Sequence, residues 1–117
     1  MQIEYNYHHR KPQFVVSERY LGMIQYTINY SVEDISESEN TQEYRYLTVE
    51  LPPGVRDRGA VISAIIRKRY SDDEMQAIIN NYLLDESDAE ARQKFQTMQQ
   101  YRQYAKSIAN KFIDEIS

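Results

Sequence analysis

The chain has 117 residues, with 14 basic and 18 acidic side chains, a net charge of −4 at pH 7 and no cysteine. This length suits a single domain, and the acidic balance excludes a general attraction to nucleic acid or anionic lipid, because neutralising phosphates needs an excess of Lys and Arg. Without cysteine there is no disulfide, thiolate nucleophile or Cys-based metal site. We expect one cytoplasmic domain over 1–117, with no secretory signal and no membrane span.

Residues 1–12 show no sustained hydrophobic period, and this pattern predicts a loose N-terminal arm. The adjacent His8 and His9 lie in this arm. They could bind a metal, but neighbouring side chains point apart in an extended chain, and no carboxylate cluster accompanies them. A mobile terminus is therefore the favoured interpretation.

Two stretches alternate apolar and polar residues with a period of two, which is typical of half-buried strands. The first runs from Tyr20 to Val32 and the second from Tyr44 to Leu51, where Pro52-Pro53-Gly54 ends it, because proline cannot donate to a strand ladder. The pattern predicts an antiparallel hairpin over 14–51, or a three-stranded meander if Phe14-Val15-Val16 adds an edge strand. The acidic residues 33–42 between the strands fit a solvated loop better than a calcium site, because they match no EF-hand spacing.

The densest apolar stretch predicts two helices, 59–70 and 72–84, hinged at Tyr70-Ser71. Ser71 and Glu74 have the spacing of a capping box at the start of the second helix, and Asp57 is a candidate cap for the first. The apolar positions at helical spacing are Val61, Ala64 and Ile65 in the first helix and Met75, Ile78, Ile79 and Tyr82 in the second. We expect the second set to form a buried stripe. Because a two-stranded hairpin is only marginally stable alone, we expect an α+β domain in which the helices cover the apolar face of the hairpin.

A third and longer helix is predicted over 88–116, starting from a capping box at Ser87-Asp88-Ala89-Glu90. Its length of roughly 42 Å exceeds the diameter of roughly 35 Å expected for a compact domain of this size. The helix must therefore overhang, kink or pack against another chain, and the last is the favoured interpretation. A heptad-like seam supplies the candidate oligomer interface: Phe95, Met98, Arg102, Ala105, Ala109, Phe112 and Ile116.

Candidate chemistry is sparse. Both histidines fall in the expected arm and the glycines stand alone, so we expect no catalytic residue, metal or cofactor site, and no small-molecule substrate. The acidic turn 71–74 has a sufficient explanation as a helix start. The candidate nucleic-acid contact is Arg67, Lys68, Arg69 and Tyr70, although basic residues at a helix C-terminus more often complement its dipole.

The stretch Leu51-Pro52-Pro53-Gly54, then Ala64-Ile65-Ile66-Arg67, then Arg69 to Tyr82, resembles small uncharacterised proteins of Bacteroides-type prophages and mobile elements. Phe95-Gln96, Arg102 and Lys106 are similar as well, and the resemblance covers about residues 47–113. It implies a phage-derived accessory or virion-assembly protein of unknown activity, in the cytoplasm or on the virion, and it transfers no functional residue.

These observations favour a non-enzymatic protein that associates with itself or with another protein. The alternative is a small accessory factor that contacts nucleic acid through the basic turn at 67–70. A third and minor hypothesis is an enzyme that uses the acidic residues 72–74, which would require carboxylates with shifted pKa values in a cleft.

Overall fold

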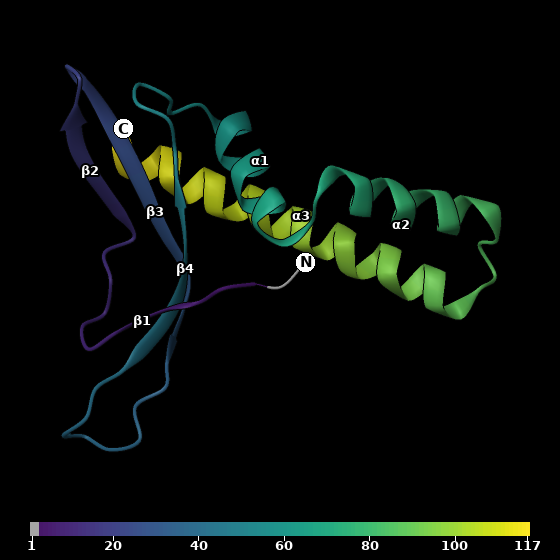
Figure 1. Cartoon of the computed structure of the whole chain (residues 1–117), viewed down its shortest axis with the longest axis horizontal. Helices are drawn as coiled ribbons and strands as arrows, with labels where there is room; N and C mark the ends of the chain where they lie inside the picture. Colours follow the sequence, from purple (N-terminus) through teal and green to yellow (C-terminus); the bar gives the residue numbers. More distant parts are fainter. Residues whose placement is uncertain (1–2) are drawn as a thin grey trace.

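The structure is a computed structural model that describes residues 3–117, so the part of the expected arm at residues 1–2 lies outside the described residues. It confirms the α+β class: an N-terminal antiparallel sheet is followed by three helices, the last of them long, and α1 and part of the last helix pack against the sheet (Figure 1). The elements in chain order are β1 (Asn6–His8), β2 (Val15–Tyr20), β3 (Met23–Asp34), β4 (Tyr44–Glu50), α1 (Arg58–Arg69), α2 (Asp72–Leu84) and α3 (Ala89–Ile116).

The four strands lie in the order β1-β4-β3-β2, and every neighbouring pair is antiparallel. The strands β2, β3 and β4 form the meander that the sequence predicted. The register of β3 against β4 shifts between Tyr30 and Glu33, where Ser31 has a φ of 52°. Such a bulge bends the strand and increases its twist.

Two strand expectations were wrong. The segment expected as a loose arm contains β1, whose residues Asn6–His8 pair with Tyr44–Tyr46 of β4. The stretch from Tyr20 to Val32 is not one strand, because Leu21 and Gly22, with φ values of 52° and 77°, form a two-residue turn and leave Tyr20 at the end of β2. A three-residue strand is too short to show a period, and leucine is unusual in a turn of this kind, which favours Asn-Gly.

The core lies between one face of the sheet, helix α1 and the C-terminal half of α3. The ring of Tyr26 meets the ring of Phe112 edge-on, with 5.3 Å between their centroids, and the Tyr101 hydroxyl donates to the Ile65 carbonyl at 3.1 Å. The fully buried side chains that join the layers are Ile28, Tyr30, Leu51, Val61, Ile65 and Phe112.

This packing corrects the predicted oligomer interface. Met98, Ala105, Ala109 and Phe112 are 0% exposed, because the chain's own sheet and helices cover them. A side chain that is already buried within the chain offers no surface to a partner. The remaining seam positions, Phe95, Arg102 and Ile116, are half-buried.

Helix α3 overhangs the sheet, one of the three outcomes its length allowed (Figure 1). Its C-terminal half covers the sheet, while its N-terminal half runs beside α2 and away from the sheet. Helix α2 has no fully buried residue, so the buried stripe expected from Met75 to Tyr82 is only partly covered. The projecting helices give the molecule extents of 47 × 42 × 22 Å and a radius of gyration of 16.9 Å, against about 13 Å for a compact domain.

The helix starts follow local capping chemistry. Asp57 accepts from the Ala60 amide at 3.0 Å and caps α1, which begins at Arg58. The expected cap of α3 was wrong by one residue, because Asp88 rather than Ser87 accepts from the Ala91 amide at 2.9 Å. Asp is as good a cap as Ser, so adjacent candidates cannot be ranked by residue type alone.

Candidate functional site

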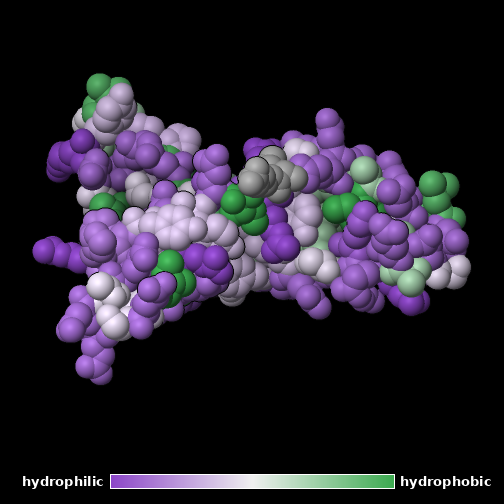
Figure 2. Space-filling model, turned by 60° about the horizontal axis from the view of Figure 1, so that its bottom comes forward, coloured by the Kyte–Doolittle hydropathy of each residue, from purple (hydrophilic) through white to green (hydrophobic). Residues whose placement is uncertain are grey.

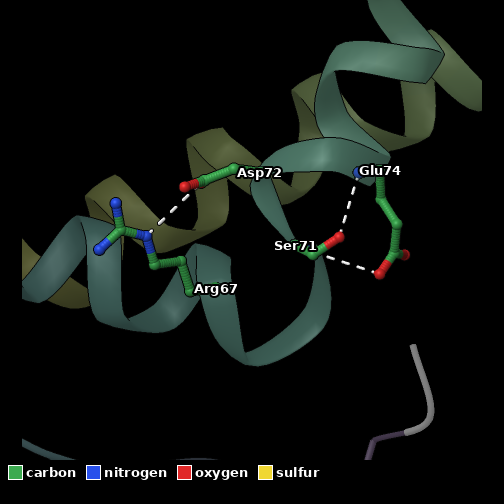
Figure 3. Close-up of polar contacts among 4 residues, drawn as sticks. All are labelled: Arg67, Ser71, Asp72 and Glu74. Carbon is green, nitrogen blue, oxygen red and sulfur yellow. Dashed lines mark hydrogen bonds and ion pairs between the residues drawn. The ribbon is translucent and has the colours of Figure 1, made fainter.

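The junction between α1 and α2 sets the direction of the projecting helices. The Ser71 hydroxyl accepts from the Glu74 amide at 3.1 Å, and the Ser71 amide donates to the Glu74 carboxylate at 3.4 Å, which completes the predicted capping box (Figure 3). Arg67 of α1 faces Asp72 of α2 across the same junction at 3.6 Å. Because the backbone amides of both Ser71 and Glu74 are bonded, the capping box fixes where α2 begins, directly after the C-cap of α1 at Tyr70.

From here on, the arm means α2, the turn 85–88 and residues 89–98 of α3, and not the N-terminal segment 1–12. Near its tip the rings of Tyr82 and Phe95 stack in parallel, with centroids 4.2 Å apart and an angle of 3° between the planes. Deeper in, Met98 is fully buried. These contacts join the two helices of the arm, so it is a packed helical hairpin rather than two separate helices.

One side of the arm carries a groove. A hollow of about 360 Å³ near the tip is lined by Ile78, Leu84 and Ala91 together with charged residues, and a hollow of about 470 Å³ nearer the base is lined by Tyr70, Ala77, Ile78 and Thr97 among others. Both hollows share Ile78, Asn81 and Lys94. The two hollows are therefore adjacent, and we call them together the arm groove.

The tip of the arm exposes large apolar side chains. Leu83 is 66% exposed and Leu84 is 83% exposed, although they follow each other at the end of α2. Figure 2 shows hydrophobic side chains at the far end of the arm and along its side, among hydrophilic neighbours. Leu84 lies on the groove side, since it lines the hollow near the tip, whereas Leu83 does not line it. Clustered apolar side chains rimmed by polar ones mark interaction surfaces in soluble proteins.

Three carboxylates lie beside the apolar side chains at the tip. Asp85 accepts from the Ser87 hydroxyl and, at 3.0 Å, from the Ser87 amide, and these bonds lower the pKa of Asp85 below its usual range. Asp88 caps α3, and Glu90 pairs with Lys94 at 3.1 Å on the same helix. All three carboxylates line the hollow near the tip and Lys94 is the only basic side chain among the described residues that line it, so the rim at this end of the arm groove has an excess of negative charge.

The basic turn was predicted as a candidate nucleic-acid contact, and the structure gives its members other neighbours. The Arg69 guanidinium lies over the ring of Tyr70 at 5.5 Å and over the ring of Tyr101 at 4.9 Å. Arg67 faces Asp72, and Lys68 is half-buried. Arg69 therefore serves as a cation–π contact at the base of the arm rather than as part of an open cationic patch.

The histidines and the acidic turn have contacts with structural roles. His8 lies in β1 and accepts from the Arg10 amide at 3.0 Å, and His9 lies 3.4 Å from the Gln42 carbonyl. Asp72 faces Arg67 and Glu74 completes the capping box, which are structural roles. Among residues 3–117 no group of three or more His, Asp or Glu side chains is placed to hold a metal ion.

Sequence reasoning placed the helices of the arm but missed the arm groove. The position of a groove depends on which side of α2 faces α3. The apolar stripe of α2 did not determine which side that is. A signal was present in Leu83-Leu84, two large apolar residues directly before the acidic turn 85–88. An apolar pair at a polar helix end has no role within the helix itself.

No family model, no curated protein and no solved structure matches this chain. Within residues 3–117 no helix is both long and apolar enough to cross a membrane. The geometry of the surface is therefore the basis for assigning a function.

Proposed function

We propose that this chain is a non-enzymatic protein-binding protein and that the arm groove is its binding surface. The observation that carries the proposal is that the apolar side chains of Ile78, Leu84 and Ala91 line the same hollow as the carboxylates Asp85, Asp88 and Glu90. The partner that fits is a protein segment with an apolar anchor flanked by Lys or Arg. An amphipathic helix lying in the groove has this chemistry.

The energetics of the groove support this mode of binding. Fully burying a leucine side chain stabilises a complex by about 1.5–3 kcal/mol, and Leu84 is almost fully available for burial. The stacked rings of Tyr82 and Phe95 hold the two helices together before any partner arrives. A preformed groove lowers the entropic cost of binding, because few side chains remain to be ordered.

The wider role belongs to the same proposal. The resemblance to proteins of prophages and mobile elements favours an accessory or assembly protein that acts in the cytoplasm or on a virion. An arm that projects from a folded body suits such a role, because a partner can reach it without contacting the sheet.

Two designed peptides test the chemistry of the groove. One is an amphipathic helix of about five turns built from Leu and Lys, and the other replaces each Lys with Glu. We expect the cationic peptide to bind, measured by fluorescence anisotropy, and the anionic peptide to bind at least about tenfold more weakly, because the tip carries a carboxylate rim. Equal binding of both peptides, or binding of neither, would show the proposal to be wrong.

Adjacent leucines provide a matched pair of variants. Leu84→Ser should weaken binding of the cationic peptide about tenfold, which corresponds to about 1.4 kcal/mol of lost apolar burial. Leu83→Ser removes an equally apolar and exposed side chain that does not line the groove, so its effect should stay within about twofold. Equal effects of the two substitutions would place the peptide elsewhere on the arm.

A further inference from the structure

The sheet ends in an open edge on the side of the molecule away from the arm. Strand β2 is the last in the order β1-β4-β3-β2, and its residues from Ser17 to Tyr20 are all exposed (Figure 1). An uncovered edge strand presents unpaired backbone groups, which form a template for another strand.

The register shows which backbone groups are free. The Asn29 amide donates to the Phe14 carbonyl at 2.8 Å, and the β2–β3 pairing continues in that register from Val15–Ile28 to Tyr20–Met23. In an antiparallel pair every second residue exchanges hydrogen bonds with the facing strand. Positions 16, 18 and 20 therefore bond to β3, and the amides and carbonyls of positions 15, 17 and 19 point outward.

This edge has few of the features that natural proteins use to prevent edge pairing, and its only charged residues are Glu18 and Arg19. Strand β2 reads Val-Val-Ser-Glu-Arg-Tyr, with neither proline nor lysine, and its register against β3 is unbroken by any bulge. The opposite edge, β1, is three residues long. Short strands, prolines, charged side chains and bulges normally protect an edge, so β2, which is six residues long and has two charged residues, is the less protected side of the sheet.

We propose that the β2 edge is a homodimer interface, in which β2 of a second copy pairs antiparallel with it about a twofold axis at Ser17. In this register Ser17 faces Ser17 of the second copy, and Val15 faces Arg19 in both directions. All three outward-facing residues are then used, giving about six backbone hydrogen bonds between the copies. The sheet becomes continuous across the interface.

Two neighbouring registers are less favourable, one because like charges meet and the other because fewer residues of β2 are paired. An axis at Glu18 places the two Glu18 carboxylates opposite each other at a separation of about 4.5 Å between Cα atoms, and like charges directly opposite destabilise a strand pair. An axis at Val16 leaves Arg19 beyond the paired residues. The axis at Ser17 avoids both costs, since it sets Glu18 against Val16.

The same register covers part of an exposed side chain at the end of the strand. Tyr20 is 52% exposed, although it is a large aromatic side chain. With the axis at Ser17, Tyr20 comes opposite position 14 of the second copy, so the partner's chain partly covers it. The arms stay free at the two far ends, and this inference does not depend on what the arm groove binds.

Cysteine cross-linking tests the register, because the chain has no cysteine of its own. A hydrogen-bonded antiparallel pair has Cα atoms about 5.5 Å apart, within the range of about 4.4–6.8 Å that a disulfide spans. Ser17→Cys should therefore give a disulfide-linked dimer under mild oxidation, read on a non-reducing gel. Arg19→Cys is the control: its position is also exposed, but its two copies lie about 14 Å apart in this register and should stay monomeric on the gel.

Hydrogen exchange of the unsubstituted protein gives a second and independent readout. The amides of Val15, Ser17 and Arg19 should exchange more slowly as protein concentration rises, because only the dimer protects them. The proposal is overturned if the Ser17→Cys and Arg19→Cys variants cross-link equally, or if exchange at these three amides does not depend on concentration. If a variant fails to fold, the exchange measurement alone decides.

Discussion

The division into a packed body and a projecting arm makes a sharp prediction about two phenylalanines of α3. Phe112 is 0% exposed and meets Tyr26 edge-on, whereas Phe95 is half-buried and stacks on Tyr82 in the arm. Both belong to the same heptad-like seam, so sequence alone treats them as equivalent. The structure predicts very different costs for truncating them.

Phe112→Ala removes a fully buried ring and leaves a cavity, a change that lowers the free energy of unfolding by about 3–5 kcal/mol. That is a large part of the total for a domain, which is typically about 5–15 kcal/mol. Phe95→Ala loses a stacked ring contact of about 0.5–1.5 kcal/mol and part of the apolar burial, so we expect about 1–2 kcal/mol. The free energies of unfolding of the two variants should therefore differ by about 2 kcal/mol.

Urea unfolding followed by far-UV circular dichroism measures this difference. With a slope of about 2 kcal/mol per molar urea, Phe112→Ala should lower the midpoint by about 2 M and Phe95→Ala by less than about 1 M, with unchanged slopes. Light scattering on the folded variants serves as the control for association. If Phe112→Ala cost less than about 1 kcal/mol and instead lowered the solution mass, the ring would lie between chains and the assignment to the core would be wrong.

Two further predictions concern the start of the arm and the tyrosine cluster in the core. Ser71→Ala should lower the free energy of unfolding by about 1 kcal/mol in urea melts, because it removes the cap of α2, whereas Ser63→Ala on the exposed side of α1 should change it little or raise it slightly. Burial raises the pKa of Tyr30 and of Tyr101, with the neighbouring Tyr101 and Tyr104 adding to the effect at Tyr30. Since the folded pKa lies above the unfolded value of about 10, the stabilisation from these neutral phenols is complete below about pH 10 and is lost as the pH rises through the folded pKa. An absorbance titration in which every tyrosine ionised with a midpoint near about pH 10, before any loss of near-UV dichroism, would contradict this burial.

An interaction could be predicted from the sequence when its residues lie close together along the chain. The capping box at Ser71 and the cap at Asp57 were predicted because each depends on residues within one helical turn. Strand β1 was missed because its partners, Tyr44–Tyr46 of β4, lie far along the chain, and three residues carry no readable period. Four of the seven residues of the candidate oligomer interface are buried within the chain for a related reason, since a heptad seam packs equally well against another chain or against the chain's own sheet.

Most of the secondary structure and the class of fold could be inferred from the amino-acid sequence. Period-two alternation, helical spacing, two prolines after β4 and acidic helix caps are local signals that backbone sterics and hydrogen bonding enforce. Which apolar faces meet was settled only by tertiary packing. That packing set the C-terminal half of α3 on the sheet, left α2 and the start of α3 as an arm, and left the edge of β2 open. The physical reason is that apolar burial is non-directional, so a stripe of apolar residues specifies that it must be covered but not what covers it.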